Sequence, residues 1–154
     1  MNCMRGRMQK ARTERRGGEG KLRTLVAADL MTSNPKTIPD GASVADAIDV
    51  LEDLDVRHLP VVDSEGNLVG ILSDRDLRPL ATERDPESRV RLIRTPVADL
   101  MTSGVVFVDP DTELSEIIDL MLEHRIGAVP VVDGDGQLVG IVSYVDILRE
   151  IVAD

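Results

Sequence analysis

The chain contains the same stretch of sequence twice. Four short motifs occur in both copies with a constant shift of 70 residues: 29–32 and 99–102 (Asp-Leu-Met-Thr), 60–63 and 130–133 (Pro-Val-Val-Asp), 68–71 and 138–141 (Leu-Val-Gly-Ile), and 73–76 and 143–146 (Ser-x-x-Asp). A register kept without insertion predicts two copies of one structural unit. We expect the two units to pack with pseudo-twofold symmetry and to form two similar clefts where they meet.

Each copy contains one long amphipathic helix by its apolar spacing. Apolar residues recur at helical intervals over 44–54 in the first copy and 114–122 in the second. Ser43 and Thr112 are placed to cap the starts of these helices. A further helix is predicted from Asp74, where Pro79 should end or kink it, and its counterpart in the second copy is predicted at 144–152.

Short runs rich in Val, Leu and Ile predict strands. The runs at 59–62 and 68–72 are joined by a polar turn and read as a β-hairpin, which the second copy repeats around its turn at 133–137. A short strand is expected before each long helix, at 37–38 and 106–108. The fold class is therefore α+β, a tandem repeat of two β-α-β-β-α units.

The same elements divide the chain into four segments. The expected organisation is a basic and disordered arm at 1–24, a first unit at 25–81, a charged connector at 82–96 and a second unit at 97–154.

Charge and composition narrow the function classes. Residues 1–23 carry a net charge of +6, and because the whole chain carries −10, the remainder carries −16. The strong negative charge of the chain beyond residue 23 disfavours nucleic-acid binding. The basic arm is the one feature that favours it. The single cysteine excludes an internal disulfide, and two histidines cannot supply a soft-metal cluster. The lack of a long apolar run or signal segment favours a cytoplasmic protein.

The Ser-x-x-Asp motifs allow two readings. A Ser before a helix with an acid three residues later is close to a capping box, which alone would explain Ser73 with Asp76 and Ser143 with Asp146. The same geometry could bind an anion at the helix start, with the Asp gripping a vicinal diol. Together these groups would suit a ribose phosphate.

The copies differ beside this motif. Arg57-His58 of the first copy corresponds to Gly127-Ala128 of the second. Arg57 is either a surface cation or a phosphate clamp that only one cleft possesses, and Arg75 could assist it or pair with a neighbouring acid. The acidic turn at 133–136 lacks the remaining ligands of a calcium loop, so it is read as turn chemistry. No nucleophile–base pair or hydrolase-type carboxylate pair stands out, so no catalytic residue is predicted.

Taken together, the eight motifs resemble the tandem cystathionine-β-synthase (CBS) domain pair, or Bateman module, in a free-standing form covering about residues 26–153. The resemblance implies a regulatory module that binds an adenosine ligand such as AMP, ADP or ATP, with S-adenosylmethionine ranking lower. Because the body of the chain is acidic, ATP is expected to bind together with Mg. The resemblance also implies a homodimer and a regulated protein partner. The composition predicts no metal site and no membrane span.

The resemblance also assigns residues to two sites. The first site is Ser73, Asp76, Arg57 and Arg75 on the sugar phosphate, with Thr102, Val106, Ile126, Gly127 and Ala128 around the base. The second and weaker site is Ser143 and Asp146, with Thr32, Lys36, Val56 and His58 on the base side. Two alternatives remain open: a ligand-free interaction scaffold in which Ser-x-x-Asp merely caps helices, and nucleic-acid attachment through the basic arm.

Overall fold

The computed structural model describes residues 9–10 and 25–153. Cys3 and nearly all of the arm expected to be disordered lie outside the described residues. The chain divides into two compact units. Among the described residues, the first unit is Lys36–Val105, and the second combines 9–10 and 25–35 with the residues from Val106 onward.

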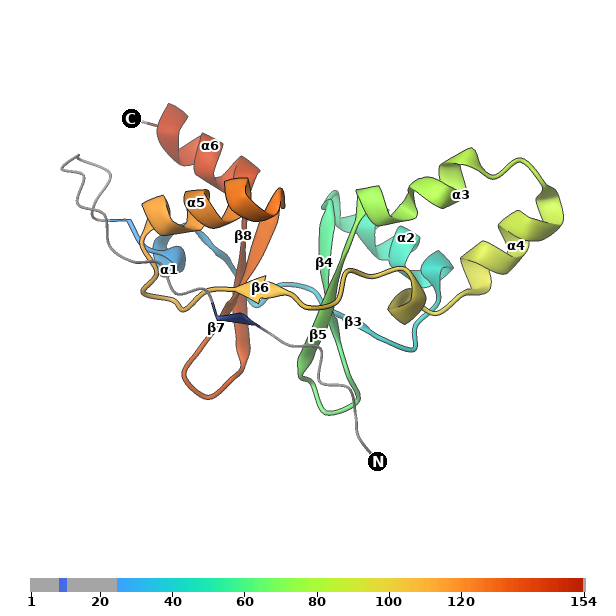
Figure 1. The fold of residues 1–154 in the computed structure, drawn as a ribbon, viewed down its shortest axis with the longest axis horizontal. Helices are drawn as coiled ribbons and strands as arrows, with labels where there is room; N and C mark the ends of the chain where they lie inside the picture. The colour runs from blue at the N-terminus through green and yellow to red at the C-terminus, as the bar shows by residue number, and fades with distance from the viewer. Residues whose placement is uncertain (1–8, 11–24, 154) are drawn as a thin grey trace. The chain divides into compact units, whose positions relative to one another are not determined.

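The two units contain corresponding elements (Figure 1). The first unit consists of β3 (Ile38–Pro39), α2 (Val44–Leu54), β4 (His58–Val62), β5 (Leu68–Ser73), the 3₁₀ helix η2 (Asp74–Leu77), α3 (Arg78–Thr82), α4 (Pro86–Arg94) and the 3₁₀ helix η3 (Val97–Asp99). The second unit consists of β1 (Gln9–Lys10), α1 (Ala27–Leu30), β2 (Thr32–Ser33), β6 (Val106–Phe107), α5 (Leu114–His124), β7 (Ala128–Val132), β8 (Leu138–Ser143) and α6 (Tyr144–Val152). The expected hairpins and long helices are confirmed, and the α6 range matches the prediction.

Each unit is built around its antiparallel hairpin. In the first unit β4 pairs with β5, and β3 joins β4 in parallel. In the second unit β7 pairs with β8, and Val108 bridges Val131 in parallel at the corresponding place. One further segment then lies beside the outer strand of each hairpin. That segment is Thr102 beside Ile71 of β5, and β2 beside β8 with Thr32 opposite Ile141.

The two repeats therefore exchange their opening segments. Thr102 belongs to the second repeat in sequence but lies on the hairpin of the first, where Ile71 and Thr102 exchange two backbone hydrogen bonds of 3.0 and 2.9 Å. Thr32 of the first repeat pairs with the hairpin of the second. Each compact unit thus combines parts of both repeats, because an extended opening segment satisfies the backbone groups of an outer hairpin strand.

Two glycines permit this exchange. A Cβ at Gly70 would lie 2.9 Å from Met101 Cγ, 3.0 Å from the Thr102 carbonyl oxygen and still closer to the Met101 sulfur. Gly140 meets Met31 of the other opening segment in the same way, with Met31 Cγ at 2.8 Å from the position of a Cβ. Glycine inside a strand commonly marks such a close approach of another segment.

The capping predictions are half right. The Asp46 backbone N–H donates to Ser43 Oγ at 3.1 Å, so Ser43 caps α2 as expected. Thr112 does not cap α5, because its hydroxyl accepts from the backbone N–H of Asp109 at 3.1 Å in the preceding turn. The N-cap residue of α5 is Glu113.

The helix after the first hairpin also differs from expectation. It begins as η2 and continues as α3, and Pro79 lies in the first turn of α3. Pro79 does not end the helix, because a proline in a first turn removes an N–H that has no partner within the helix. Residues 82–96, expected as a connector, include the helix α4.

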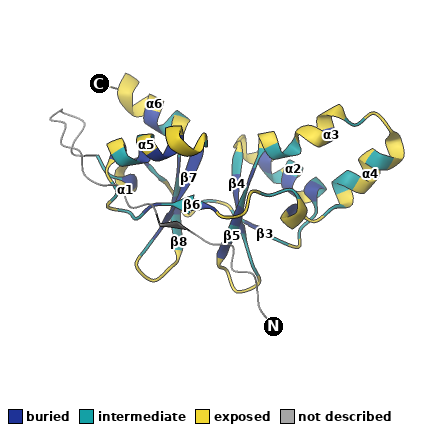
Figure 2. Cartoon of the chain, viewed as in Figure 1, coloured by how far each residue is buried: buried dark blue, intermediate teal, exposed yellow. Residues whose placement is uncertain are grey.

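Each unit buries an aliphatic core between its hairpin and its long helix (Figure 2). The first core includes Leu51, Leu59 and Leu72, and the second includes Ile117, Val129 and Val142, each at most 8% exposed. No buried polar or charged side chain occurs among the residues that the structure describes. The cores therefore depend on aliphatic burial, as the composition predicted.

Candidate functional site

The end of β5 brings the first Ser-x-x-Asp motif together. The backbone N–H of Ser73 donates to Asp76 Oδ2 at 2.8 Å, and the Ser73 hydroxyl donates to the same oxygen at 3.1 Å. The backbone N–H of Asp74 donates to the carbonyl oxygen of Arg57 at 3.1 Å, which joins the start of β4 to the start of η2. Both Ser73 and Asp76 are half-buried. One carboxylate oxygen is therefore committed to local structure, as the capping interpretation requires.

The second carboxylate oxygen faces Thr102. The Thr102 hydroxyl donates to Asp76 Oδ1 at 3.4 Å, and Thr102 itself is exposed. Thr102 lies 26 residues along the chain from Asp76. The exchange of opening segments brings its hydroxyl to the carboxylate of Asp76. The result is a partly exposed pair of oxygens from one carboxylate and one hydroxyl. Such a pair can both accept from and donate to a vicinal diol.

The second unit repeats the motif with two differences. Ser143 donates its backbone N–H and its hydroxyl to Asp146 Oδ2, each at 2.9 Å, and the N–H of Tyr144 donates to the Gly127 carbonyl oxygen at 2.9 Å. Thr32 occupies the place of Thr102 beside the hairpin. Between these described residues no hydrogen bond joins Thr32 to Asp146. The Asp146 backbone N–H also donates to Ser143 Oγ at 3.3 Å, a cap hydrogen bond that Ser73 does not make in the first unit. The two motifs thus share the hydrogen bonds to one carboxylate oxygen and differ both in this cap and in the outer carboxylate oxygen.

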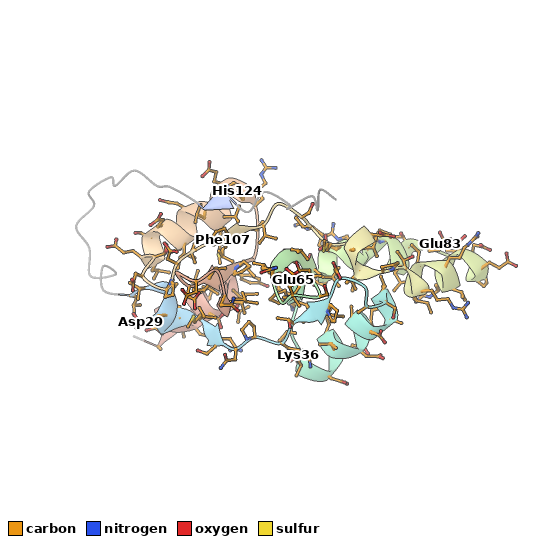
Figure 3. The ribbon with its side chains drawn as sticks, turned by 90° about the horizontal axis from the view of Figure 1, so that it is seen from below. Asp29, Lys36, Glu65, Glu83, Phe107 and His124 are labelled. Atoms are coloured by element: carbon orange, nitrogen blue, oxygen red, sulfur yellow. The ribbon has the colours of Figure 1, made fainter. Side chains whose placement is uncertain are left out.

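The remaining residues assigned by resemblance fall in both units. Arg57 and Arg75 are exposed residues of the first unit, and Arg57 directly precedes β4. Residues of the base side of the first site lie in the second unit: Val106 on β6, Ile126 and Gly127 before β7, and Ala128 at its start. Residues of the base side of the second site lie in the first unit, except Thr32: Lys36 (Figure 3), Val56 and His58. Their roles stay predictions.

Sequence reasoning missed two parts of this arrangement. The packing of Met101 on Gly70 and of Met31 on Gly140 had one available signal, a glycine inside each predicted strand. No sequence signal indicated that the Thr102 hydroxyl would contact Asp76. That contact depends on which hairpin each opening segment joins.

His58 lies opposite Ser73 across the hairpin and carries a perturbed pKa. Burial is the largest cause and lowers the pKa of His58 below 6.5, while the charges of Asp74 and Asp76 raise it and that of Arg57 lowers it further. Loss of hydration disfavours the charged imidazolium. His58 is therefore held in its neutral form beside the Ser-x-x-Asp motif.

Acidification is expected to destabilise the fold through His58. Its folded pKa lies below 6.5, so the unfolded chain binds more protons in the interval between the two values. The contribution of neutral His58 is fully present above pH 6.5 and is lost as the pH falls through the folded pKa. Urea unfolding at pH 7.5 and 5.5 should show a smaller loss of unfolding free energy for His58→Gln than for wild type. The exposed His124 provides a control, since His124→Gln should behave as wild type, and equal losses in all three proteins would contradict this assignment.

The first aspartate of each acidic hairpin loop accepts backbone hydrogen bonds that close the turn. Asp63 Oδ1 accepts the backbone N–H groups of Glu65 and Asn67, both at 2.9 Å, and Asp133 Oδ1 accepts those of Asp135 and Gln137 at the same distance. These hydrogen bonds lower the pKa of Asp63. Within the described part of the chain, no group of three or more His, Cys, Asp or Glu is arranged to hold a metal ion.

Comparisons with known proteins bear on this site. A family model for the CBS domain matches residues 26–81 and 97–153. Inosine-5'-monophosphate dehydrogenase of Methanocaldococcus jannaschii is 33% identical over 129 residues, which are 84% of this chain and 23% of that protein. The chain thus spans less than a quarter of that enzyme.

Two solved structures carry adenosine ligands. CBSX2 of Arabidopsis thaliana in complex with AMP has a TM-score of 0.70 and 33% identity, over 83% of this chain and 96% of that one. The CBS domain pair of protein MJ0100, in complex with 5'-methylthioadenosine and S-adenosyl-L-methionine, has a TM-score of 0.73 and 27% identity, over 84% of this chain and 97% of that one.

Proposed function

The chain belongs to the CBS-domain family, and from that premise we propose that it binds an adenosine nucleotide and reports its occupancy to a protein partner. CBS-pair structures similar to this chain contain AMP or S-adenosyl-L-methionine. The single observation that carries the proposal is the position of Asp76, with one carboxylate oxygen fixed by Ser73 and the other facing the exposed hydroxyl of Thr102.

This arrangement suits a ribose. Asp76 Oδ2 already accepts two hydrogen bonds from Ser73, which fixes the orientation of the carboxylate. Its interaction with Thr102 is long, at 3.4 Å, so a ligand hydroxyl can replace it at little cost. A hydrogen bond from a ribose hydroxyl to a carboxylate is charge-assisted and stronger than a neutral one. We assign the ribose to Asp76 and the phosphate to Arg57, with Arg75 in support.

The two sites are proposed to differ in affinity. Gly127 stands where Arg57 stands in the first copy, so the Ser143–Asp146 site lacks the corresponding guanidinium. Because the chain beyond residue 23 carries a net charge of −16, a polyphosphate is repelled unless a cation accompanies it. We therefore rank AMP, or ATP with Mg²⁺, above free ATP, and S-adenosylmethionine below them.

Isothermal titration of the full chain with AMP, ADP, ATP and S-adenosylmethionine tests the proposal. We expect saturable heat with AMP, and weaker binding of ATP without Mg²⁺ than with it. No heat with any of the four ligands would overturn the proposal and favour the ligand-free scaffold, in which the Ser-x-x-Asp hydrogen bonds serve only as caps.

Signalling of occupancy requires a second conformation or a partner that binds the two states differently. We propose that the partner is a separate protein, that this chain is not itself an enzyme, and that it acts in the cytoplasm. Among the described residues, no helix combines the length and the hydropathy that a membrane crossing needs.

We further propose a homodimer formed through the helices of the second unit. Both α5 and α6 contain exposed positions (Figure 2). Large apolar side chains are among them, with Leu122 72%, Leu148 54% and Ile151 50% exposed. Large exposed apolar side chains are a feature of protein interfaces. Leu148→Glu should shift the sedimentation coefficient from that of a dimer to that of a monomer. Val90→Glu, at an exposed apolar residue on α4 of the first unit, is the control, and an unchanged dimer in Leu148→Glu would exclude this interface.

A further inference from the structure

The edge of β6 carries a strand from the far N-terminal part of the chain. β1 pairs in parallel with β6, with Gln9 opposite Val106 and Lys10 opposite Phe107 (Figure 1). A free strand edge is a template for pairing with any extended segment. Here the segment comes from the arm at 1–24, whose first 23 residues carry a net charge of +6.

An acidic cavity begins where β6 ends. It has a volume of about 540 Å³ and lies between the segment that follows β6, the first turn of α5 and the β7–β8 turn. Phe107 (Figure 3) contributes to both β6 and the cavity wall. Three carboxylates line it, from Asp109, Asp111 and Glu116, and no basic side chain lines it among the described residues.

We propose that β6 and this acidic cavity form an intramolecular docking surface for the chain's own basic arm. The backbone pairing of β1 with β6 fixes where the arm contacts the second unit. Because β1 runs parallel to β6, both strands point toward the cavity that begins where β6 ends. Opposite charge then favours the docked arm over the detached one. An edge strand of only two residues holds a second strand weakly, so the charge of the cavity determines how firmly the arm is held. Docking of the arm needs no bound nucleotide.

Limited trypsin digestion of the full chain tests this docking. The variant is Asp111→Asn with Glu116→Gln, which removes two cavity charges without adding a trypsin site. Its matched control is Asp49→Asn with Asp53→Asn, which removes two exposed charges from α2 of the first unit. Initial cleavage within residues 10–23 should be about fivefold faster in the cavity variant than in the control, as expected for the loss of two exposed charge interactions. Wild type should match the control, and 0.5 M salt should remove the difference.

Two further readouts make the test decisive. Thermal unfolding of the cavity variant should match that of wild type, and amide exchange should be faster at Val106 and Phe107 but unchanged in β4. Equal arm cleavage in the three proteins would overturn the proposal. Protection that grows with protein concentration would also overturn it, because the docked arm would then come from a second copy.

Discussion

Gly70→Val is expected to destabilise the first unit by about 2–4 kcal/mol, which corresponds to a loss of roughly 10 °C in melting temperature. The new side chain would clash with Met101 and with the Thr102 carbonyl oxygen. The methionine side chain can move, but the backbone oxygen can move only if the two hydrogen bonds between Ile71 and Thr102 break. The Thr102 hydroxyl would then leave Asp76, so AMP affinity should fall together with stability. Thermal unfolding and AMP titration measure the two effects.

Gly41→Val is the control for this prediction. No atom lies within 4 Å of a Cβ at Gly41, so its melting temperature should stay within about 2 °C of wild type. Gly140→Val should destabilise the second unit through Met31 in the same way. A Gly70→Val protein as stable as the Gly41→Val protein would show that the opening segment of the second repeat does not pack on β5.

Asp76→Asn is expected to weaken AMP binding roughly tenfold to a hundredfold while leaving stability nearly unchanged. An asparagine oxygen can still accept the N–H and the hydroxyl of Ser73, which are the hydrogen bonds that stabilise the start of η2. What is lost is the charge and the second acceptor oxygen that faces Thr102. Asp76→Ala would also remove the hydrogen bonds from Ser73, so a loss of AMP affinity could not be separated from a loss of stability.

The ligand offers a matched control for the same residue. If Asp76 holds the ribose, then 2'-deoxy-AMP should bind wild type more weakly than AMP does, and Asp76→Asn should discriminate less between the two nucleotides. Asp146→Asn should have a smaller effect than Asp76→Asn, because the second site is proposed to be weaker. Unchanged AMP affinity in Asp76→Asn, together with a large loss of stability, would show that the Ser-x-x-Asp motif serves only to stabilise the helix start.

The repeat and the local patterns predicted most of the fold. Apolar spacing located α2 and α5, and the paired β-rich runs located both hairpins, because these signals depend on neighbouring residues. Two local predictions were wrong. Thr112 is equally suited to cap a helix or to close the preceding turn, and the structure uses it in the turn. Pro79 lies in the first turn of α3 instead of ending a helix, because the 3₁₀ helix η2 ends at Leu77 and α3 begins at Arg78.

The composition of the site was only partly predictable. Ser73 and Asp76 are three residues apart, so their meeting follows from the local helix start. Thr102 meets Asp76 only because the opening segment of one repeat lies on the hairpin of the other, and both hairpins have nearly the same sequence. Pairing within one repeat and exchange between repeats would bury the same apolar residues. The sequence pattern alone therefore could not choose between them.

The most direct test of the central proposal is the amide spectrum of the full chain during a titration with AMP. We expect saturable shifts of the Ser73, Asp74 and Thr102 amide signals first, and shifts of the Ser143 and Tyr144 signals only at higher AMP concentration. Shifts confined to other parts of the chain, or a spectrum that does not change at millimolar AMP, would contradict it.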